Sequence, residues 1–493
     1  MRTKQVWLLV LTVAVLLIFY LLVTSSSDES GYTHYESGTN PRASRKFRNV
    51  IVHLDLKGAP PRVEYLEQFF ALLSRHFVDG VLIEYEDMFP YSGEIEPIRR
   101  DVHYSVADIR RILAAAEKNN LEVIPLIQSF GHLEFVLKRP HFMQLSEDLI
   151  DLNTICISDE KSIEIVQQMI LQIRELHPNA TRIHIGADEA YHVAEDKRCT
   201  DRMEKEKIGR SQLKMNHIAR IGKFARGAGF KTVFAWNDMF DKESEDSIRE
   251  AKVHEYIVPV VWGYRTDVTE PGYFPDGLFD RIADVFDEFY VASAYKGADG
   301  SRQQFSNISR YLEVQKSYVK LMDLHPNAGK KVEGIFVTGW SRYNHFNVLC
   351  ELLPVAVPSL IVDLTFLNYQ LGSSRSWKAM KESLRCGDKH YLRGIQIEWA
   401  IHDCSFPGAN AFEIVMNDWK NLVDRRIFGK NGMRSTSAEA VTVLNRLKNA
   451  LKDVLYKNDI EEVYNQYLQD FHSIQTSSDV DGSTVAEKNT LSR

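Results

Sequence analysis

The chain has 493 residues, of which 44% are hydrophobic and 26% charged, and its formal net charge is −7. These proportions are typical of globular proteins and exclude a largely disordered chain, a collagen and a coiled-coil rod. The acidic balance, without a basic stripe, gives a nucleic-acid partner no electrostatic support. Five cysteines without a CxxC pair lack the spacing of a zinc ribbon or a thioredoxin motif, and their odd number leaves at least one thiol unpaired within the chain.

The N-terminal segment contains an apolar run over residues 6–23, in which Thr12 is the only polar residue. An apolar run of this length fits a membrane-spanning helix better than a cleaved signal peptide, whose apolar core has about 7–15 residues. Arg2 and Lys4 precede the run and acidic residues follow it, so we expect residues 1–5 in the cytosol and the body in the lumen. The sequence therefore predicts a single-pass type II protein of a secretory-pathway membrane, with the Golgi favoured because the span is short.

The alternative for this segment is a signal peptide cleaved near Ser25. Residues 24–46 are rich in Ser, Gly, Thr and charge and are typical of a stem or linker. Asn179 and Asn307 each begin an N-x-[ST] sequon, which predicts N-glycosylation of a lumenal body.

Eight short β-branched and apolar runs alternate with longer amphipathic segments in the body of the chain. The predicted strands are 49–56, 80–85, 121–128, 181–188, 231–236, 256–262, 288–294 and 333–340. The clearest predicted helices are 63–77, 105–119, 161–177 and 211–229, the second with a capping box of Ser105 and Asp108. Most strand runs are apolar throughout, as in parallel strands buried on both faces.

Eightfold alternation of strand and helix predicts a (β/α)₈ barrel over residues 47–404, with an open doubly wound sheet as the alternative. Neither GxGxxG nor GxxxxGK[ST] follows a strand, so a nucleotide site lacks its usual mark. Residues 394–402 resemble one further strand. Residues 405–474 are predicted to be a helical C-terminal region, and residues 475–493 a disordered tail.

Functional residues of such a barrel cluster at the C-terminal ends of its strands. Asp188 and Glu189 end the fourth run, and neighbouring carboxylates raise each other's pKa, which keeps one protonated as a general acid. An N-cap Asp followed by a helix-start Glu is the bland alternative. Trp236, Trp262 and Trp340 end three other runs and predict an aromatic wall for a sugar ring, although each alone is explained equally well by barrel packing.

The segment HIGADEAY (184–191) resembles the active-site motif of glycoside hydrolase family 20, the β-N-acetylhexosaminidases. The resemblance covers about residues 48–360. Within the family, the chain resembles the hexosaminidase D subgroup rather than the lysosomal enzymes. The other segments that carry it are VHLDLKGAPP (52–61), LIEYEDMFPY (82–91), EVIPLIQSFGHLEFVLK (122–138), ASAYKGA (292–298) and TGWSRYNHFNVLCELLP (338–354).

The resemblance implies a retaining mechanism in which the substrate's own 2-acetamido oxygen is the nucleophile, with no metal and no cofactor. Glu189 is then the general acid and base, and Asp188 orients the acetamido group. The tyrosine that bonds the acetamido oxygen is Tyr295, with Tyr264 as the alternative. His132 supports the carboxylates, or is a structural histidine.

This sequence departs from the family where sugar hydroxyls are read. Asp55 and Lys57 stand where an arginine is usual, and Trp340-Ser-Arg342 replaces Trp-x-Glu. Together with the pair and the aromatic wall, the candidate substrate-binding residues are therefore Asp55, Glu84, Asp238 and Arg342, with a structural role as the alternative for Glu84 and Asp238.

The predicted function is exo-acting hydrolysis of terminal β-linked GalNAc or GlcNAc from glycans or glycoconjugates, and the oligomeric state is left open. An inactive, lectin-like glycan-binding barrel is the alternative. A chitinase lacks its DxxDxDxE motif here, and a metal-dependent barrel hydrolase lacks an H-x-H pair.

Overall fold

The computed structural model describes residues 45–369, 381, 383–386, 403–429 and 434–474, and within them eight parallel strands form a closed barrel. Each strand pairs with the next along the chain, and β8 pairs with β1. The predicted barrel is confirmed, and the open sheet is wrong. The strands are β1 (Asn49–Asp55), β2 (Gly80–Glu84), β3 (Glu122–Leu126), β4 (Arg182–His184), β5 (Thr232–Trp236), β6 (Val258–Trp262), β7 (Phe289–Lys296) and β8 (Val332–Gly339).

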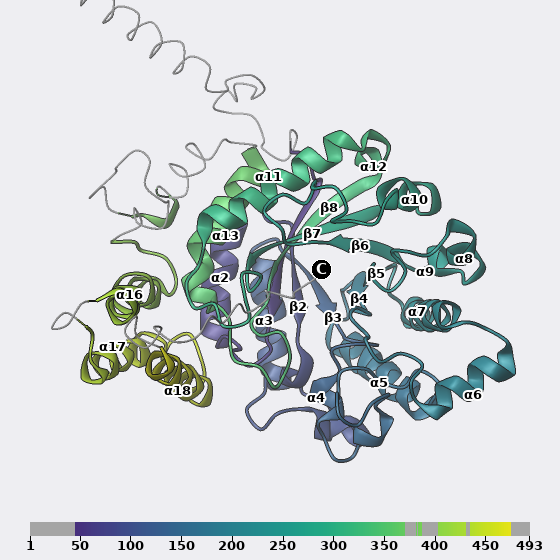
Figure 1. Cartoon of the computed structure of the whole chain (residues 1–493), viewed down its shortest axis with the longest axis horizontal. Helices are drawn as coiled ribbons and strands as arrows, with labels where there is room; N and C mark the ends of the chain where they lie inside the picture. Colours follow the sequence, from purple (N-terminus) through teal and green to yellow (C-terminus); the bar gives the residue numbers. More distant parts are fainter. Residues whose placement is uncertain (1–44, 370–380, 382, 387–402, 430–433, 475–493) are drawn as a thin grey trace, which may run out of the picture.

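Helices surround the barrel as a ring (Figure 1). The longest pack an apolar face against the strands, and Ser105 caps α3 in the predicted capping box. The ring contains α2 (Val63–Arg75), α3 (Val106–Lys118), α5 (Glu160–Leu176), α7 (Arg210–Gly227), α8 (Glu245–Glu250), α9 (Val253–Tyr256), α10 (Leu278–Val285), α11 (Ile308–Leu324), α12 (Pro326–Lys331) and α13 (Leu353–Tyr369). Shorter elements at strand ends are η2 (Glu86–Met88), η3 (Gly93–Ile98), α4 (Glu134–Leu137), η4 (Met143–Leu145) and α6 (Lys197–Glu206).

Packed apolar side chains, which include Phe234 and Phe336, fill the barrel interior in a thick layer. Below this layer, at the N-terminal ends of the strands, Arg182 forms a salt bridge with Glu122 and donates to the Tyr290 hydroxyl at 3.1 Å. These contacts close the base of the barrel. The opposite, C-terminal end is the mouth, above which the loops after each strand meet.

The fourth strand is shorter than predicted. It ends at His184, whereas the apolar pattern continues to residue 188. Gly186 and Ala187 have φ of +61° and +69°, which is left-handed backbone and ends the extended conformation.

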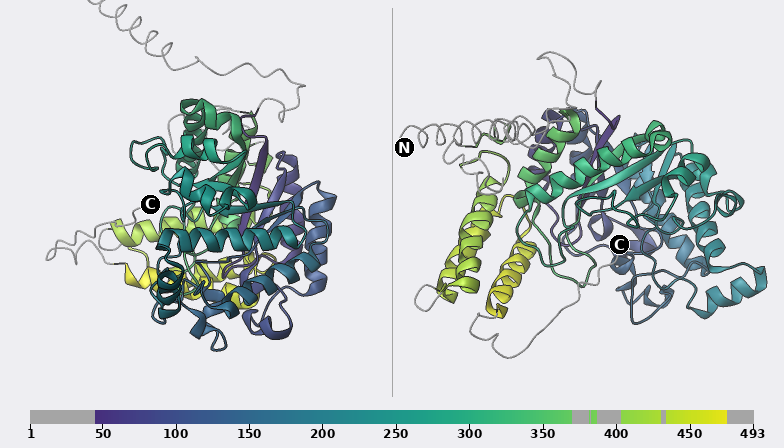
Figure 2. Two further views of the ribbon diagram at one scale, coloured as in Figure 1. Left: turned by 90° about the vertical axis from the view of Figure 1, so that its right-hand side faces the viewer. Right: turned by 45° about the horizontal axis from the view of Figure 1, so that its top comes forward.

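Five further elements pack beside the barrel on one side (Figures 1 and 2). They are α15 (Ala409–Glu413), η6 (Ile414–Trp419, a π-helix), α16 (Lys420–Phe428), α17 (Ser437–Ala450) and α18 (Lys457–Ser473). Arg62 N–H donates to the Val454 carbonyl at 2.7 Å, and Arg100 pairs with the buried Asp459 at 2.7 Å. The C-terminal helices are therefore bonded to loops at the barrel mouth.

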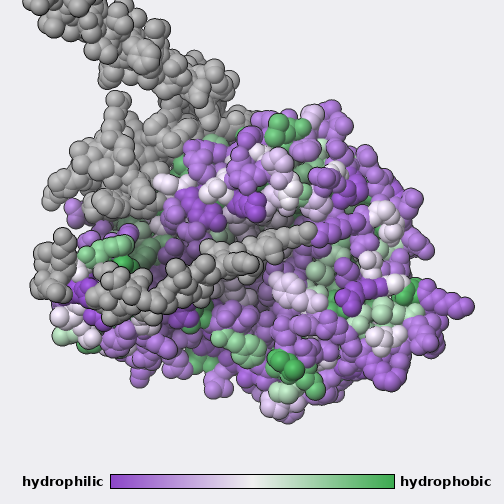
Figure 3. All heavy atoms as spheres, viewed as in Figure 1, coloured by the Kyte–Doolittle hydropathy of each residue, from purple (hydrophilic) through white to green (hydrophobic). Residues whose placement is uncertain are grey.

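Several predicted features lie outside the described residues: the apolar run 6–23, most of the stem, the strand-like run 394–402 and the tail 475–493. Among the described residues, no helix is long and apolar enough to cross a membrane. Cys386 and Cys404 form a disulfide. On the face shown in Figure 3, hydrophilic residues dominate the described surface and apolar residues form small separate groups.

Candidate active site

The loop after β4 brings Asp188 and Glu189 to the same place. Adjacent side chains of a regular strand point to opposite faces, but Glu189 has a φ of +45°, which turns the chain. His132 Nε2 lies 3.1 Å from Glu189 Oε2 and 3.5 Å from Asp188 Oδ2, so one imidazole contacts both carboxylates. This approach requires glycine at position 131, because a Cβ there would lie 2.1 Å from the Asp188 carbonyl oxygen.

The two carboxylates differ in their affinity for protons. Burial, with the charges of Asp238 and Glu189, raises the pKa of Asp188 to about 8 despite the opposing charge of His132. Burial also acts to raise the pKa of Glu189, but its hydrogen bonds with His132 and Tyr191, together with the charges of His132 and Lys57, lower it. Burial opposes a charged imidazole, yet Asp188 and Glu189 raise the pKa of His132 to about 10. The group is thus an imidazolium between an ionised and a protonated carboxyl near neutral pH.

Asp188 retains an open bonding position. Its side chain is buried, and Oδ1 has no hydrogen-bond partner among the described residues. A buried oxygen without a hydrogen-bond partner is costly, so this atom is suited to accept an N–H from a bound molecule.

Asp238 holds the neighbouring parts of the site. Its Oδ2 accepts the Glu189 main-chain N–H at 2.9 Å, and its Oδ1 accepts Trp262 Nε1–H at 3.1 Å. Burial raises the pKa of Asp238 to about 6. Since both oxygens already have donors, the contacts favour positioning of the acid loop over the predicted bonding to a sugar hydroxyl.

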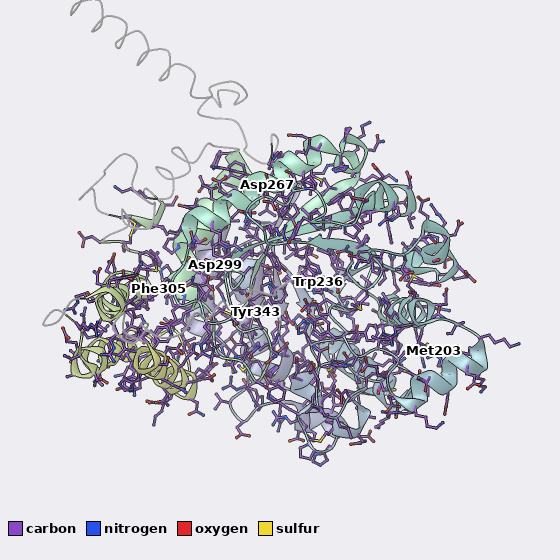
Figure 4. The ribbon with its side chains drawn as sticks, in the orientation of Figure 1. Met203, Trp236, Asp267, Asp299, Phe305 and Tyr343 are labelled. Atoms are coloured by element: carbon purple, nitrogen blue, oxygen red, sulfur yellow. A yellow bond between two sulfur atoms is a disulfide. The ribbon has the colours of Figure 1, made fainter. Side chains whose placement is uncertain are left out.

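The three tryptophans of the predicted wall come together at the mouth. The rings of Trp236 and Trp340 lie 6.1 Å apart, and Trp262 stacks on Tyr264 at 5.4 Å. Trp236 is 1% exposed and lies near the middle of the barrel (Figure 4), so it forms the floor. Trp262 and Trp340 are partly buried and line the sides.

Tyr264, rather than Tyr295, faces this site. The Tyr264 hydroxyl accepts Trp340 Nε1–H at 3.1 Å, and burial, together with the Asp188 charge, raises its pKa. Tyr295 is fully buried on the other side of the strand wall, where it packs against Gly339 and donates to the His53 carbonyl at 3.3 Å. The prediction for Tyr295 is therefore corrected: β7 presents alternate residues to the interior, and Tyr295 belongs to the set that faces the helices.

Asp55 and Glu84 also differ from their predicted role as hydroxyl ligands. Glu84 is 0% exposed, and its two oxygens contact His53 Nε2 at 3.1 Å and Gln128 Nε2 at 3.0 Å. Asp55 accepts main-chain N–H groups from Lys57 at 2.8 Å and Ser341 at 2.7 Å. The oxygens of both acids are therefore already hydrogen-bonded to groups of the protein at the strand ends.

Arg342 lies beside the C-terminal helices. It forms a salt bridge with Glu462 of α18 and lines a polar cavity of about 300 Å³ between the C-terminal helices and the segments after β1, β2, β3 and β8. Its predicted contact with a sugar hydroxyl stays a prediction. The cavity also exposes Asp87, Arg100 and Lys138, so both signs of charge line it.

One residue near the acid was not assigned from the sequence. Tyr191 hydrogen-bonds Glu189 and is 60% exposed, and burial of its hydroxyl beside Glu189 raises its pKa. It belongs to the HIGADEAY segment, so its place in the motif was the available signal.

The two sequon asparagines are exposed, Asn179 between α5 and β4 and Asn307 at the start of α11. Asn307 Oδ1 accepts the Arg310 N–H at 3.1 Å and so caps that helix. Glycosylation at either residue stays a prediction.

The chain is similar in sequence to known glycoside hydrolases. Residues 86–348 match the catalytic domain of glycosyl hydrolase family 20. Hexosaminidase D from Bos taurus is 39% identical over 319 residues, which span 64% of this chain and 91% of the bovine protein. Hexosaminidase D from Homo sapiens is 38% identical over 382 residues, which span 77% of this chain and 76% of the human protein.

Solved structures of low sequence identity share the fold. A chitobiase from Flavobacterium johnsoniae superposes with a TM-score of 0.55 at 12% identity, covering 87% of this chain and 68% of that one. An exo β-N-acetylglucosaminidase from Vibrio harveyi, solved in complex with N-acetylglucosamine, gives a TM-score of 0.50 at 16% identity, covering 69% of this chain and 58% of that one.

Proposed function

Because this chain belongs to glycosyl hydrolase family 20, we propose that it is an exo-acting β-N-acetylhexosaminidase that removes terminal β-linked GlcNAc or GalNAc by a retaining, substrate-assisted reaction. The observation that carries the proposal is the convergence of Asp188 and Glu189 on His132, with an unpartnered oxygen on Asp188. A polar group that needs a donor, beside a carboxyl that can transfer a proton, is what this reaction requires.

In the first step, the acetamido N–H donates to Asp188 Oδ1 and the Tyr264 hydroxyl donates to the acetamido oxygen. That oxygen attacks the anomeric carbon and forms a cyclic oxazolinium ion, while Glu189 protonates the glycosidic oxygen and the bond to the aglycone breaks. In the second step, Glu189 takes a proton from water, which attacks the same carbon, opens the ring and restores the acetamido group.

The pair must exchange one proton before the first step. In the free protein the higher pKa of Asp188 keeps the proton there. An N–H donated by the substrate favours the ionised form of Asp188 and leaves the proton for Glu189. Substrate binding thereby leaves Glu189 protonated and able to act as the general acid.

The wall of Trp262 and Trp340 provides aromatic faces for the apolar side of the sugar ring. The floor at Trp236 limits depth, which supports an exo-acting site that accepts a chain end. The glycan or glycoconjugate is the proposed binding partner, and no cofactor takes part in these steps.

We also propose that residues 6–23 anchor the protein in a secretory-pathway membrane, the Golgi favoured, with the barrel in the lumen and glycans on Asn179 and Asn307. The apolar run and the exposed sequons support this. Extraction of membranes with alkaline carbonate should leave the protein in the pellet. Its release, or the absence of a mass shift on deglycosylation, contradicts the anchor or the glycans respectively.

The catalytic proposal is tested by assaying the full chain on aryl β-N-acetylglucosaminide and aryl β-N-acetylgalactosaminide. We expect turnover, and a fall in kcat of about 10²–10⁴-fold in Glu189→Gln on substrates with poor leaving groups. Glu160→Gln, an exposed carboxylate paired with Arg220, is the matched control and should keep full activity. Full activity in Glu189→Gln contradicts the assignment, and glycan binding without turnover indicates a lectin-like barrel.

A further inference from the structure

A second cluster of reactive side chains lies behind the acid loop. Glu147, Cys156 and Cys199 are buried, and one carboxylate oxygen and two sulfurs lie within 4.8 Å of one another. The two Sγ atoms are 3.7 Å apart, and Cys199 Sγ is 2.7 Å from Glu147 Oε1. Cys199 stands 43 residues after Cys156, and the three residues match no metal-binding spacing, so the sequence alone does not predict a metal here.

We propose that Glu147, Cys156 and Cys199 bind a zinc ion that fixes the acid loop from behind. Two thiolates and a carboxylate are a donor set that zinc accepts. Zinc–sulfur bonds of about 2.3 Å at a tetrahedral angle place two sulfurs about 3.8 Å apart, close to the observed 3.7 Å. The Glu147 oxygen has to withdraw from Cys199 by a small rotation, since a sulfur and an oxygen on one zinc are about 3.5 Å apart.

The surroundings supply anchorage for the ligands. Glu147 Oε2 accepts the main-chain N–H groups of Glu195 at 3.2 Å and Asp196 at 2.9 Å, which leaves Oε1 for the metal. Ser158 Oγ lies 3.0 Å from Cys199 Sγ and marks the fourth position, which the hydroxyl or a water occupies.

The charge balance is also suitable. Two thiolates, one carboxylate and Zn²⁺ leave a single negative charge, and binding releases the two thiol protons to solvent. Arg198 interacts electrostatically with Cys156 and is held by Asp159 at 2.7 Å, so it provides a neighbouring positive charge.

The site connects the two segments that border the general acid. Cys199 lies in the first turn of α6, directly after the loop of Asp188 and Glu189, whereas Glu147 and Cys156 belong to the segment before α5. Between those two, the Asn153 amide lies 3.0 Å from the Glu189 carbonyl oxygen. The metal is therefore a positioning element that touches no substrate, and it is independent of the proposed reaction.

Metal analysis of the full chain, purified in air-free buffer without chelator or reductant, tests the proposal. We expect about one zinc per chain in the wild type, and at least about a ten-fold lower content in Cys156→Ser and Cys199→Ser. Cys350→Ser removes the other buried free thiol, outside the cluster, and should keep its zinc.

Cobalt titration of chelator-treated wild-type chain removes the dependence on variants that fold. Co²⁺ bound by two thiolates gives an intense near-ultraviolet sulfur-to-cobalt absorption, which added zinc should abolish. Absence of both zinc and this absorption, with three thiols titrating in the denatured chain, overturns the proposal. One titrating thiol instead indicates a disulfide between Cys156 and Cys199, which overturns it as well.

Discussion

The barrel mouth carries two pairs of acidic side chains that the structure treats differently. Asp55 and Glu84, at the ends of β1 and β2, have donors on every carboxylate oxygen. Asp188 and Glu189, after β4, share one imidazole, and Asp188 Oδ1 has no partner among the described residues. The first pair joins strands, and the second keeps a bonding position open. Position at a strand end therefore does not distinguish a catalytic acid from a structural one; the bonds already made do.

We expect the pair of Asp55 and Glu84, whose oxygens already have donors, to matter for stability. Glu84→Gln weakens the hydrogen bond from His53 Nε2 and places an amide against the Gln128 amide, so we expect a loss of about 1–3 kcal/mol in the free energy of unfolding. Denaturant unfolding measures this, with Glu160→Gln as a surface control that should cost about 0–1 kcal/mol. The folded variant should keep kcat within a few-fold; a large fall in kcat at unchanged stability makes Glu84 a substrate ligand.

We expect the pair of Asp188 and Glu189 to matter for catalysis and not for stability. Asp188→Asn places an amide where the acetamido N–H needs an acceptor, so kcat should fall by about 10²–10³-fold. Azide should not restore activity, because oxazolinium formation itself fails. Melting temperature is the accompanying measurement, and it should not decrease, since burial already keeps Asp188 protonated near neutral pH. Recovery with azide contradicts the role given to Asp188.

Tyr264 and Tyr295 place one hydroxyl on each side of the strand wall. Tyr264→Phe should lower kcat by about 10- to 100-fold, the size of a lost hydrogen bond to a charged centre. Tyr295→Phe loses only its bond to the His53 carbonyl and should keep kcat, with a stability cost of about 1 kcal/mol. Steady-state kinetics of both variants decides between them, and the opposite ranking restores Tyr295.

The last prediction concerns the pH dependence of stability. The pKa of His132 is raised to about 10 in the folded state, so its contribution is complete below about 6.5 and is lost as pH rises towards 10. The raised pKa of Asp188 acts in the same direction up to about 8, because the folded state keeps a proton that the unfolded chain has released. Melting temperature should fall between pH 6.5 and 9, less steeply in His132→Gln; equal slopes contradict the imidazolium.

Local patterns were sufficient for the barrel and for the acidic pair. The strands are continuous apolar runs with helical segments between them, and such runs survive in almost any tertiary context. Asp188 and Glu189 lie in a segment that resembles the family motif. The left-handed backbone at Glu189, which makes the two side chains converge, could not be predicted, because no glycine stands at that position.

The remaining site residues depend on facts that a sequence does not carry. Tyr295 was misassigned because a strand buried on both faces shows no alternation that tells inside from outside. Arg342 follows a strand end as expected, but its partner, Glu462, comes from a helix 120 residues further on. Glu147, Cys156 and Cys199 meet only through the packing of α6 against the segment before α5.

The base of the barrel is sealed by the contacts of Arg182 with Glu122 and Tyr290, beneath a packed apolar layer. Among the described residues the base is therefore closed, and the sugar released by the proposed hydrolase cannot leave through it. We expect each released monosaccharide to leave at the mouth, where the next chain end enters. Catalysis should then be distributive, shortening many glycans by one unit each before any is fully trimmed, and the free sugar should compete with substrate as it accumulates.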